Sequence, residues 1–357
     1  MGSLKTRITD LLGIRYPVIQ TGMGWVSNAV LTAATSSAGG LGILGSATMT
    51  LEEVRRALDE IRSITDAPFG VNFRSDNPEV DRIVDLMIEK RVKVASYGRA
   101  PRKELIKKLK AAGIVNIPTI GAVRHAQKAV EWGVDAVIVQ GSEGGGHTGQ
   151  VPTSLLLPQV VDAIDIPVIA AGGYFDGRGL VSALAYGAQG IAMGTRFLLT
   201  RESPVHQSVK DVYVARSVTD TIVTTSIDGA PQRVIRTPLV DRLERGSGLG
   251  RMIRAAQNGL RFRRLTGTTF RALIREGFEM KRSQQLTWAQ MLMAPNAPML
   301  TRAALVEGHP ESGVMPVGQV VGLIDDIPSV QDLINRIMRE ASEVIARLSE
   351  SSRAILS

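Results

Sequence analysis

The chain has 357 residues, of which 44% are hydrophobic and 21% charged, and a formal net charge of +8. This composition is typical of globular proteins, and a chain of this length forms either two domains or one large α/β barrel with additions. Cysteine is absent, which excludes disulfides and thiolate metal sites and suits a reducing compartment. No apolar run reaches the length of a membrane span, and residues 1–10 lack the apolar core of a signal peptide, so we expect a cytoplasmic protein that does not bind membranes.

Short apolar runs alternate with helical patterns from Tyr16 to about Leu199. The runs lack polar alternation, which predicts parallel strands buried on both faces. The predicted strands are Pro17–Gln20, Leu41–Leu44, Phe69–Phe73, Val92–Tyr97, Val115–Ile120, Ala136–Gln140, Pro167–Ala171 and Gly190–Met193.

Amphipathic helices are predicted between these strands. Their apolar residues recur at helical spacing, as in Leu51–Ile64, and several end at a glycine before the next strand, namely Gly113, Gly133 and Gly187. The other helices predicted in this way are Val80–Glu89, Arg102–Ala112 and Val123–Trp132. Eight strand–helix units favour an α/β fold of the (β/α)₈ TIM-barrel type over an open, doubly wound sheet.

The alternation stops after Leu199. We therefore assign residues 1–204 to the barrel, 205–311 to an inserted, mainly helical, basic cap, and 312–357 to a return loop and a helix that closes the barrel wall. That helix is predicted over Ser329–Ser349, with Ser329 as its N-cap and Asp332 three residues on.

The positive charge is concentrated in the predicted cap. Residues 232–282 hold 13 Lys and Arg against 4 Asp and Glu, or +9, so the rest of the chain carries 8 − 9 = −1. A basic face is usually only a solvated surface, but this one falls in the segment expected to cover the barrel mouth. It would attract an anionic small-molecule substrate, whereas nucleic acid is disfavoured because no reader motif is visible and aromatics are few.

A glycine-rich loop, Gly141–Gly149, follows the sixth predicted strand and contains His147. Glycine lets the backbone approach a ligand closely, and a histidine there can transfer protons near neutral pH. The alternative is that His147 only pins the loop, but its glycine neighbours offer little side chain to pin. We expect the other histidines, His125, His206 and His309, to lie on the surface, and no spacing predicts a metal site.

Two further loops, after the seventh and eighth predicted strands, suit a phosphate. They contain Gly172, Gly173, Gly194 and Thr195, whose backbone N–H groups and hydroxyl can donate to an anion, and the following helix starts add positive potential. The alternative is that these glycines only form tight turns. Asp176, in the first of these loops, is expected to be a helix N-cap.

Taken together, the motifs resemble the nitronate monooxygenase family, also called 2-nitropropane dioxygenase-like. The family includes FMN-dependent NAD(P)H:quinone reductases and is similar to flavin-dependent enoyl-ACP reductases. The motifs span nearly the whole chain: Gln20-x-Gly22-Met23, Ala38-Gly39-Gly40-Leu41-Gly42, Gly70-Val71-Asn72, Glu143-x-x-Gly146-His147-x-Gly149, Ala170-Ala171-Gly172-Gly173, Gly194-Thr195-Arg196-Phe197 and Gly318-Gln319-x-x-Gly322-Leu323-Ile324.

The resemblance implies FMN at the C-terminal mouth of the barrel and His147 as the catalytic residue. It implies phosphate contacts from Gly172, Gly173, Gly194 and Thr195. The flavin ring and ribityl contacts that it implies are Gly22, Met23, Asn72, Gln140, Gly145 and Gln319.

The first motif reads Gly22-Met23-Gly24-Trp25, not the Ala-Pro-Met form of typical nitronate oxidisers, and is closer to the reductase branch. The chain is also similar to actinobacterial members of the family that act on steroid C/D-ring CoA thioesters, whose phosphates suit a basic cap. We expect an FMN-dependent oxidoreductase that moves hydride between the flavin and a C–C bond of a CoA thioester, with NAD(P)H as a candidate electron partner. Nitronate oxidation with O₂, quinone reduction, a barrel without redox chemistry and a homo-oligomer stay open.

Overall fold

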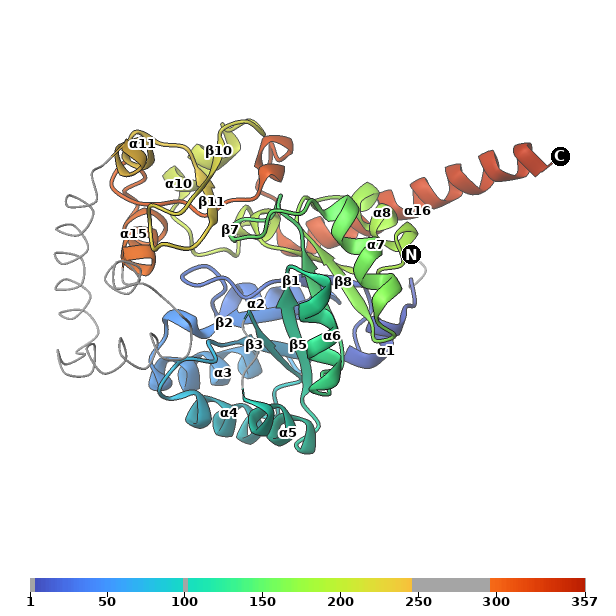
Figure 1. Ribbon diagram of the computed structural model, residues 1–357, viewed down its shortest axis with the longest axis horizontal. Helices are drawn as coiled ribbons and strands as arrows, with labels where there is room; N and C mark the ends of the chain where they lie inside the picture. Colours follow the sequence, from blue (N-terminus) through green and yellow to red (C-terminus); the bar gives the residue numbers. More distant parts are fainter. Residues whose placement is uncertain (1–3, 99–101, 246–295, 357) are drawn as a thin grey trace.

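The structure, a computed structural model, describes residues 4–98, 102–245 and 296–356 (Figure 1). Eight parallel strands pair in sequence order around a closed barrel, and β1 joins the last strand, β9, through pairs such as Ile19 with Ala192. The TIM-barrel prediction is confirmed. The barrel strands are β1 (Val18–Gln20), β2 (Leu41–Gly45), β3 (Phe69–Asn72), β4 (Val94–Tyr97), β5 (Val115–Ile120), β6 (Val137–Gln140), β8 (Val168–Ala171) and β9 (Ile191–Met193).

The barrel interior is filled with side chains, and one end is closed. Alternate strand residues such as Ile43, Ile117 and Ile138 form one buried cluster, because successive side chains of a strand point to opposite faces. Ile8 and Leu12 of helix α1 (Arg7–Leu12) belong to the same cluster and are fully buried. Since α1 precedes the first strand and packs into the interior cluster, the opposite end of the barrel, where the strands terminate, is the end available for a site.

Helices wrap the outside of the barrel as predicted. Gly113, Gly133 and Gly187 have φ values of +74°, +82° and +89°, the left-handed conformation that ends a helix at little cost only for glycine. The wall helices are α2 (Ala29–Ser37), α3 (Leu51–Ile64), α4 (Val80–Glu89), α5 (Lys103–Ala111), α6 (Val123–Glu131), α7 (Thr153–Ala163) and α8 (Gly177–Ala185), with a short 3₁₀ turn, η1 (Ser46–Thr48), after β2.

The eighth helical position is filled from the C-terminus of the chain. Helix α9 (Thr195–Leu198), which follows β9, is only four residues long, and α16 (Val330–Leu356) packs instead against α8 and α2. The two helices meet closely at Gly177, where an added Cβ would lie 2.3 Å from the backbone N of Ala341. Beyond this crossing the end of α16 extends away from the barrel (Figure 1).

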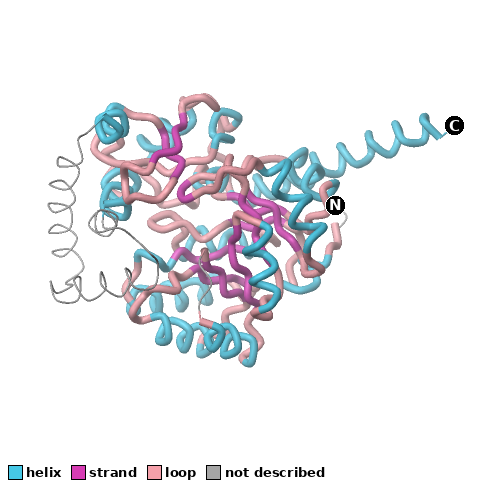
Figure 2. Tube along the Cα trace, in the orientation of Figure 1, coloured by secondary structure: helices cyan, strands magenta, loops and turns pink. Residues whose placement is uncertain are grey.

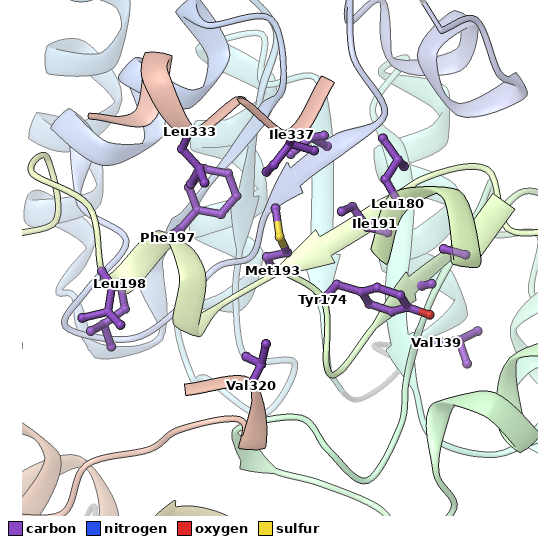
Figure 3. Packing of buried hydrophobic residues seen from close by; sticks show 14 of the residues in the cluster. Val139, Tyr174, Leu180, Ile191, Met193, Phe197, Leu198, Val320, Leu333 and Ile337 are labelled. Atoms are coloured by element: carbon purple, nitrogen blue, oxygen red, sulfur yellow. The ribbon is translucent and has the colours of Figure 1, made fainter. Parts of the chain in front are cut away.

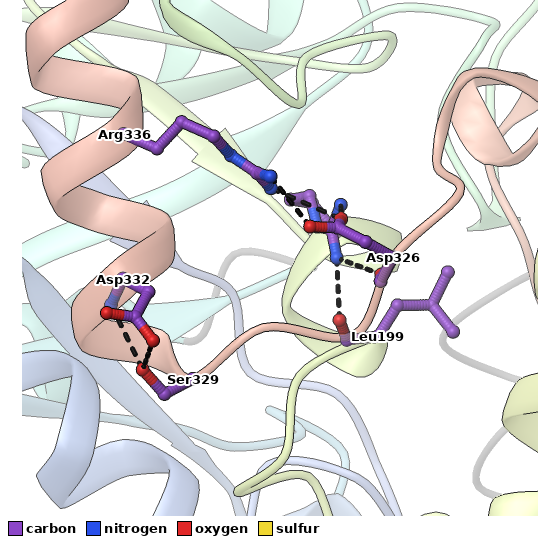
Figure 4. Close-up of polar contacts among 6 residues, drawn as sticks. Leu199, Asp326, Ser329, Asp332 and Arg336 are labelled. Carbon is purple, nitrogen blue, oxygen red and sulfur yellow. Dashed lines mark hydrogen bonds and ion pairs between the residues drawn. The ribbon is translucent and has the colours of Figure 1, made fainter.

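Polar contacts stabilise the start of α16 and the segment that leads into it (Figure 4). Asp332 N–H donates to the Ser329 hydroxyl at 3.1 Å, which confirms the predicted N-cap. Arg196 of α9, 1% exposed, donates to an Asp326 carboxylate oxygen at 2.9 Å and to the carbonyls of Leu199 and Asp326. Arg336 of α16 binds the same carboxylate at 2.6 Å. Burial lowers the pKa of Arg196 and Asp326 opposes that shift, while the Arg336 hydrogen bond leads in holding the pKa of Asp326 below its ordinary value.

The segment between α9 and α16 contains helices, and it also contains a small sheet, which the sequence did not predict (Figure 2). Strands β10 (Thr221–Thr224) and β11 (Gln232–Ile235) form an antiparallel hairpin, and β7 (Gly146–His147) adds to β11 as a third strand. The helices described in this segment are α10 (Gln207–Val214), α11 (Pro238–Arg245) and α15 (Asn296–Leu305), followed by the 3₁₀ helix η2 (Gln319–Leu323). Most of the basic segment, and the Gly- and Ser-containing stretch near Gly246–Gly250, lie outside the described residues. Among those that are described, we find no helix with the length and apolarity that crossing a bilayer requires.

Candidate active site

The predicted site residues lie where the barrel strands end, on the side away from α1. Asn72 and Gln140 are the last residues of β3 and β6, and Gly22, Gly172 and Gly194 follow β1, β8 and β9 directly or within two residues. Parallel strands of a closed barrel end at the same rim, so residues 50 or more positions apart in the chain are brought to one face.

Glycines let the first loop pack directly on its neighbours. A Cβ added at Gly22 would lie 2.2 Å from the Cβ of Asn72, so the β1 loop rests on the end of β3. At the end of the neighbouring strand β9, a Cβ at Gly194 would lie 3.3 Å from Met23 Sδ. Met23, Asn72 and Gly194 are thereby joined by contact.

The return segment before η2 completes the ring. The backbone N–H of Gly318 donates to Thr195 Oγ1 at 2.9 Å, and that of Gln319 donates to the Glu143 carbonyl at 2.9 Å. A Cβ at Gly145 would lie 2.6 Å from Gly318 N, so glycine is required for this approach. The backbone of Gln319 is thus held between the β9 loop and the glycine-rich loop.

His147 lies at the edge of this ring with an open side chain. The Gln140 amide donates to the His147 carbonyl at 3.0 Å, while the His147 side chain is 62% exposed. His125, His206 and His309 are exposed, as predicted.

The two loops predicted to hold a phosphate offer free backbone donors. Gly172 and Gly173 have φ values of +98° and +82°, and a Cβ at Gly173 would have no atom nearer than 3.8 Å. Within the residues described by the structure, the backbone N–H groups of Gly172, Gly173 and Gly194 donate no hydrogen bond. Open N–H groups of this kind suit an anion.

The N-termini of the helices that follow these loops offer less to an anion than the sequence suggested. The first turn of α8 is already satisfied, because Gly179 N–H donates to Asp176 at 2.9 Å and Gly177 N–H donates to Glu340 at 2.9 Å. The predicted N-cap role of Asp176 is therefore confirmed, and the positive end of α8 is occupied by carboxylates. Because α9 is only four residues long, its N-terminus adds little positive potential, and the loop N–H groups are the main candidate donors to an anion.

Buried side chains beneath the two loops keep them in place (Figure 3). Tyr174 follows Gly173, Met193 precedes Gly194 and Phe197 follows Thr195, and all three belong to the main hydrophobic cluster with Val320 of η2 and Ile337 of α16. The loops are therefore flanked by side chains that pack in the main hydrophobic cluster.

Two side chains that sequence reasoning missed contact the glycine-rich loop from the small sheet. The His147 Nε2–H donates to Asp228 Oδ2 at 2.8 Å, and the Arg233 guanidinium donates to the Ser142 carbonyl at 3.0 Å and 3.2 Å. Asp228 is 10% exposed. Burial alone would raise the pKa of Asp228, but hydrogen bonds from His147 and from Ala230 N–H outweigh burial and hold it below its ordinary value. No local motif marked either residue.

A second contact joins the cap to the β1 loop. Trp25 has a φ of +65°, unusual for a residue with a large side chain, and its indole N–H donates to the Pro298 carbonyl at 3.1 Å. The Arg302 guanidinium lies 5.3 Å from the centre of the indole ring. Helix α15 is thereby fixed to the rim beside Met23.

Comparisons with known proteins agree on one family. A family model described as nitronate monooxygenase matches residues 5–85 and 76–340. The chain is 54% identical over 348 residues, covering 98% of this chain and 99% of the relative, to the (3aS,4S,5R,7aS)-5-hydroxy-7a-methyl-1-oxo-octahydro-1H-indene-4-carboxyl-CoA dehydrogenase of Rhodococcus jostii. The Mycobacterium tuberculosis protein of the same name is 54% identical, with 95% of this chain and 96% of the relative covered. The solved structure of FabK from Thermotoga maritima matches with a TM-score of 0.80 and 37% identity, covering 98% of this chain and 100% of FabK.

Proposed function

Because this chain belongs to the nitronate monooxygenase family and is an oxidoreductase, we propose that it is an FMN-dependent CoA-thioester dehydrogenase. The observation that carries the proposal is the 54% identity, over 98% of the chain, to a relative named as a carboxyl-CoA dehydrogenase. The rim geometry supports the proposal, because His147 lies beside a ring of backbone that could hold a ligand.

The residues at the rim fit FMN. A terminal phosphate needs several donors, and the free N–H groups of Gly172, Gly173 and Gly194 can supply them. The ribityl chain and the flavin ring would be held by Gly22, Met23, Asn72, Gln140, Gly145 and Gln319, and Thr195 would add its hydroxyl to the phosphate. The bound flavin supplies an acceptor for hydride.

His147 is proposed as the base in this reaction. Dehydrogenation beside a thioester removes a proton from the carbon next to the carbonyl and a hydride from the following carbon, and a C=C bond forms. The exposed imidazole of His147 takes the proton, which the neighbouring thioester carbonyl acidifies. A bound flavin would supply the acceptor for that hydride and its two electrons.

The substrate is proposed to be a fused-ring, steroid-derived CoA thioester, on the basis of the relatives' names. The basic segment at residues 232–282 supports a ligand with several phosphates, because arginines bind phosphate in a bidentate manner. NAD(P)H or NAD(P)⁺ is the proposed partner for turnover, and we place the enzyme in the cytoplasm.

Nitronate oxidation is the second candidate, because the matching family model carries that description. His147 would then orient an alkyl nitronate, and O₂ would be the electron acceptor. The glycine-led Gly22–Trp25 motif favours the thioester reaction.

Anaerobic stopped-flow measurement of the flavin band tests the two candidates side by side. The purified protein is mixed separately with NADH, NADPH, propionate 3-nitronate and a saturated fused-ring acyl-CoA, with the same acyl group on N-acetylcysteamine as the matched control for the CoA part. We expect reduction by the acyl-CoA and much weaker reduction by the short thioester. A flavin spectrum that millimolar acyl-CoA leaves unperturbed, together with rapid reduction by nitronate, would move the assignment to the second candidate. A purified protein without flavin absorbance would overturn both.

A further inference from the structure

A buried carboxylate from the cap contacts the proposed base. Asp228 lies in the connection between β10 and β11, 81 residues after His147 in the chain. Its Oδ2 is 2.8 Å from His147 Nε2, and its Oδ1 accepts from Ala230 N–H at 3.1 Å. Both carboxylate oxygens are therefore engaged, and only one of them is directed at the imidazole.

The backbone on both sides holds this contact. In the small sheet His147 is paired directly with Gln232, and Thr148 N–H donates to the Pro231 carbonyl at 3.2 Å. The Arg233 guanidinium binds the carbonyl of Ser142 in the same loop. A surface ion pair between flexible side chains lacks such a frame, so the geometry of His147 and Asp228 is set by the sheet register and not by chance.

The surrounding charges leave Asp228 as the partner of the imidazole. The Glu143 carboxylate, in the same loop, is taken up by Thr153, which donates from its N–H at 2.9 Å and from its hydroxyl at 2.8 Å. Arg233, from β11, is directed at Ser142. Among the residues that the structure describes, no hydrogen bond is formed by His147 Nδ1.

We propose that Asp228 is a positioning residue for His147: it accepts the Nε2–H, fixes that tautomer and leaves Nδ1 as the atom that takes the substrate proton. The ionised carboxylate also stabilises the imidazolium that forms when the proton is taken. This inference rests on the proposed function for the identity of the base. It further implies that the cap, through the β10–β11 connection, forms part of the catalytic machinery.

Titration of the His147 imidazole tests the proposal without substrate. The flavin-loaded protein is labelled at its four histidines, and the His147 signal is identified by its loss in His147→Asn. In Asp228→Asn the His147 signal should titrate at lower pH than in the parent protein, because a negative charge in contact with the ring is removed. Asp228→Glu should restore part of the shift. Asp241→Asn, which alters an exposed cap carboxylate paired with Arg236, is the matched control and should leave the titration unchanged.

Kinetics provide the second measurement. The acidic limb of the pH profile for flavin reduction by acyl-CoA, where protonation of the base slows the reaction, should move to lower pH in Asp228→Asn, with kcat reduced more than KM is raised. Flavin absorbance and a cooperative thermal transition show that the variants are folded. An imidazole titration that is unchanged in both Asp228 variants overturns the proposal. A shifted titration in a protein that no acyl-CoA reduces supports the pairing and overturns the proposed function instead.

Discussion

The barrel rim and the small cap sheet contribute to the site in different ways. The rim offers backbone: Gly172, Gly173 and Gly194 present N–H groups on loops held by buried neighbours. The cap sheet offers side chains: Asp228 contacts His147, and Arg233 contacts the loop that carries it. In the proposed function, the barrel would bind the cofactor and the cap would position the base.

This difference explains how one barrel can serve several chemistries. A bound phosphate requires close approach and N–H donors, which glycine loops can supply. The orientation of a side chain that accepts a proton depends on its partners, and an inserted segment can supply such a partner without altering the rim.

The largest expected effect comes from closing the rim. Gly173→Val adds a side chain where φ is +82° and where the phosphate is expected, so flavin should be lost together with all flavin-dependent activity, while the barrel still folds. Gly133→Val is the matched control, since Gly133 also has φ +82°, has no atom within 4 Å of an added Cβ and lies far along the chain at the end of α6. The flavin-to-protein absorbance ratio measures the result. Equal flavin content in the two variants would show that this loop does not bind the phosphate.

Gly194→Val separates blocking from backbone strain. Its φ of −102° is open to any residue, so the substitution adds bulk over the N–H group without a left-handed penalty. We expect loss of FMN here as well, measured by the same ratio. Retention of stoichiometric flavin would place the phosphate elsewhere.

The next effect tests the cap side of the comparison. His147→Asn should keep the flavin, because none of the proposed flavin contacts comes from the His147 side chain, and should slow flavin reduction by substrate about 10²–10⁴-fold, the range for loss of a general base. Single-turnover reduction at saturating substrate measures it. A His125→Asn control changes an exposed helix residue and should behave as the parent protein. A small effect of His147→Asn would return this residue to a loop-pinning role.

A smaller effect is expected at the closure of the barrel wall. Asp326→Asn leaves the buried Arg196 without its carboxylate and should lower the free energy of unfolding by about 2 kcal/mol, less than for a fully buried pair since Asp326 is partly exposed. The pKa of Asp326 is depressed in the folded state, so its contribution is present above the unfolded pKa and is lost as the pH falls through the folded pKa. Urea unfolding of the parent and the variant at neutral pH and at about pH 3 measures both the loss and its pH dependence. A stability difference between the two proteins that grows on acidification would contradict the ion-pair account.

The smallest effect concerns the contact between helix α15 of the cap and the β1 loop at the rim. Trp25→Phe removes the indole N–H that donates to Pro298 and should destabilise the protein by about 1 kcal/mol, the usual size for one hydrogen bond. Flavin content should be unchanged, since Trp25 lies beyond the rim glycines. Thermal unfolding with flavin absorbance as the second signal measures it, and a large loss of flavin would show that cap and rim do not act separately.

Much of the barrel could be predicted from the sequence. The apolar runs, the helical spacing of Leu51–Ile64 and the helix-ending glycines are local signals, because burial on both faces, the helical period and a positive φ each restrict residue choice directly. The rim glycines were marked by the same reasoning, and the structure brings them together. Their roles toward a cofactor stay a prediction.

The small sheet could not be predicted in this way. Strand β7 is two residues long and glycine-led, and it has strand structure only because β11 lies beside it. Likewise, α9 is too short to complete the wall, and nothing near Gly194 shows that α16, more than 130 residues later, fills the place.

The sequence by itself determined the fold class, the family and the set of glycine loops at one rim, since these depend on period, composition and short motifs. Only the tertiary structure decided that the cap sheet includes the glycine-rich loop and that Asp228 contacts His147. The physical reason is that strand register and long-range closure are chosen by the packing of the whole chain, and a carboxylate 81 residues away carries no local mark of the partner it will meet.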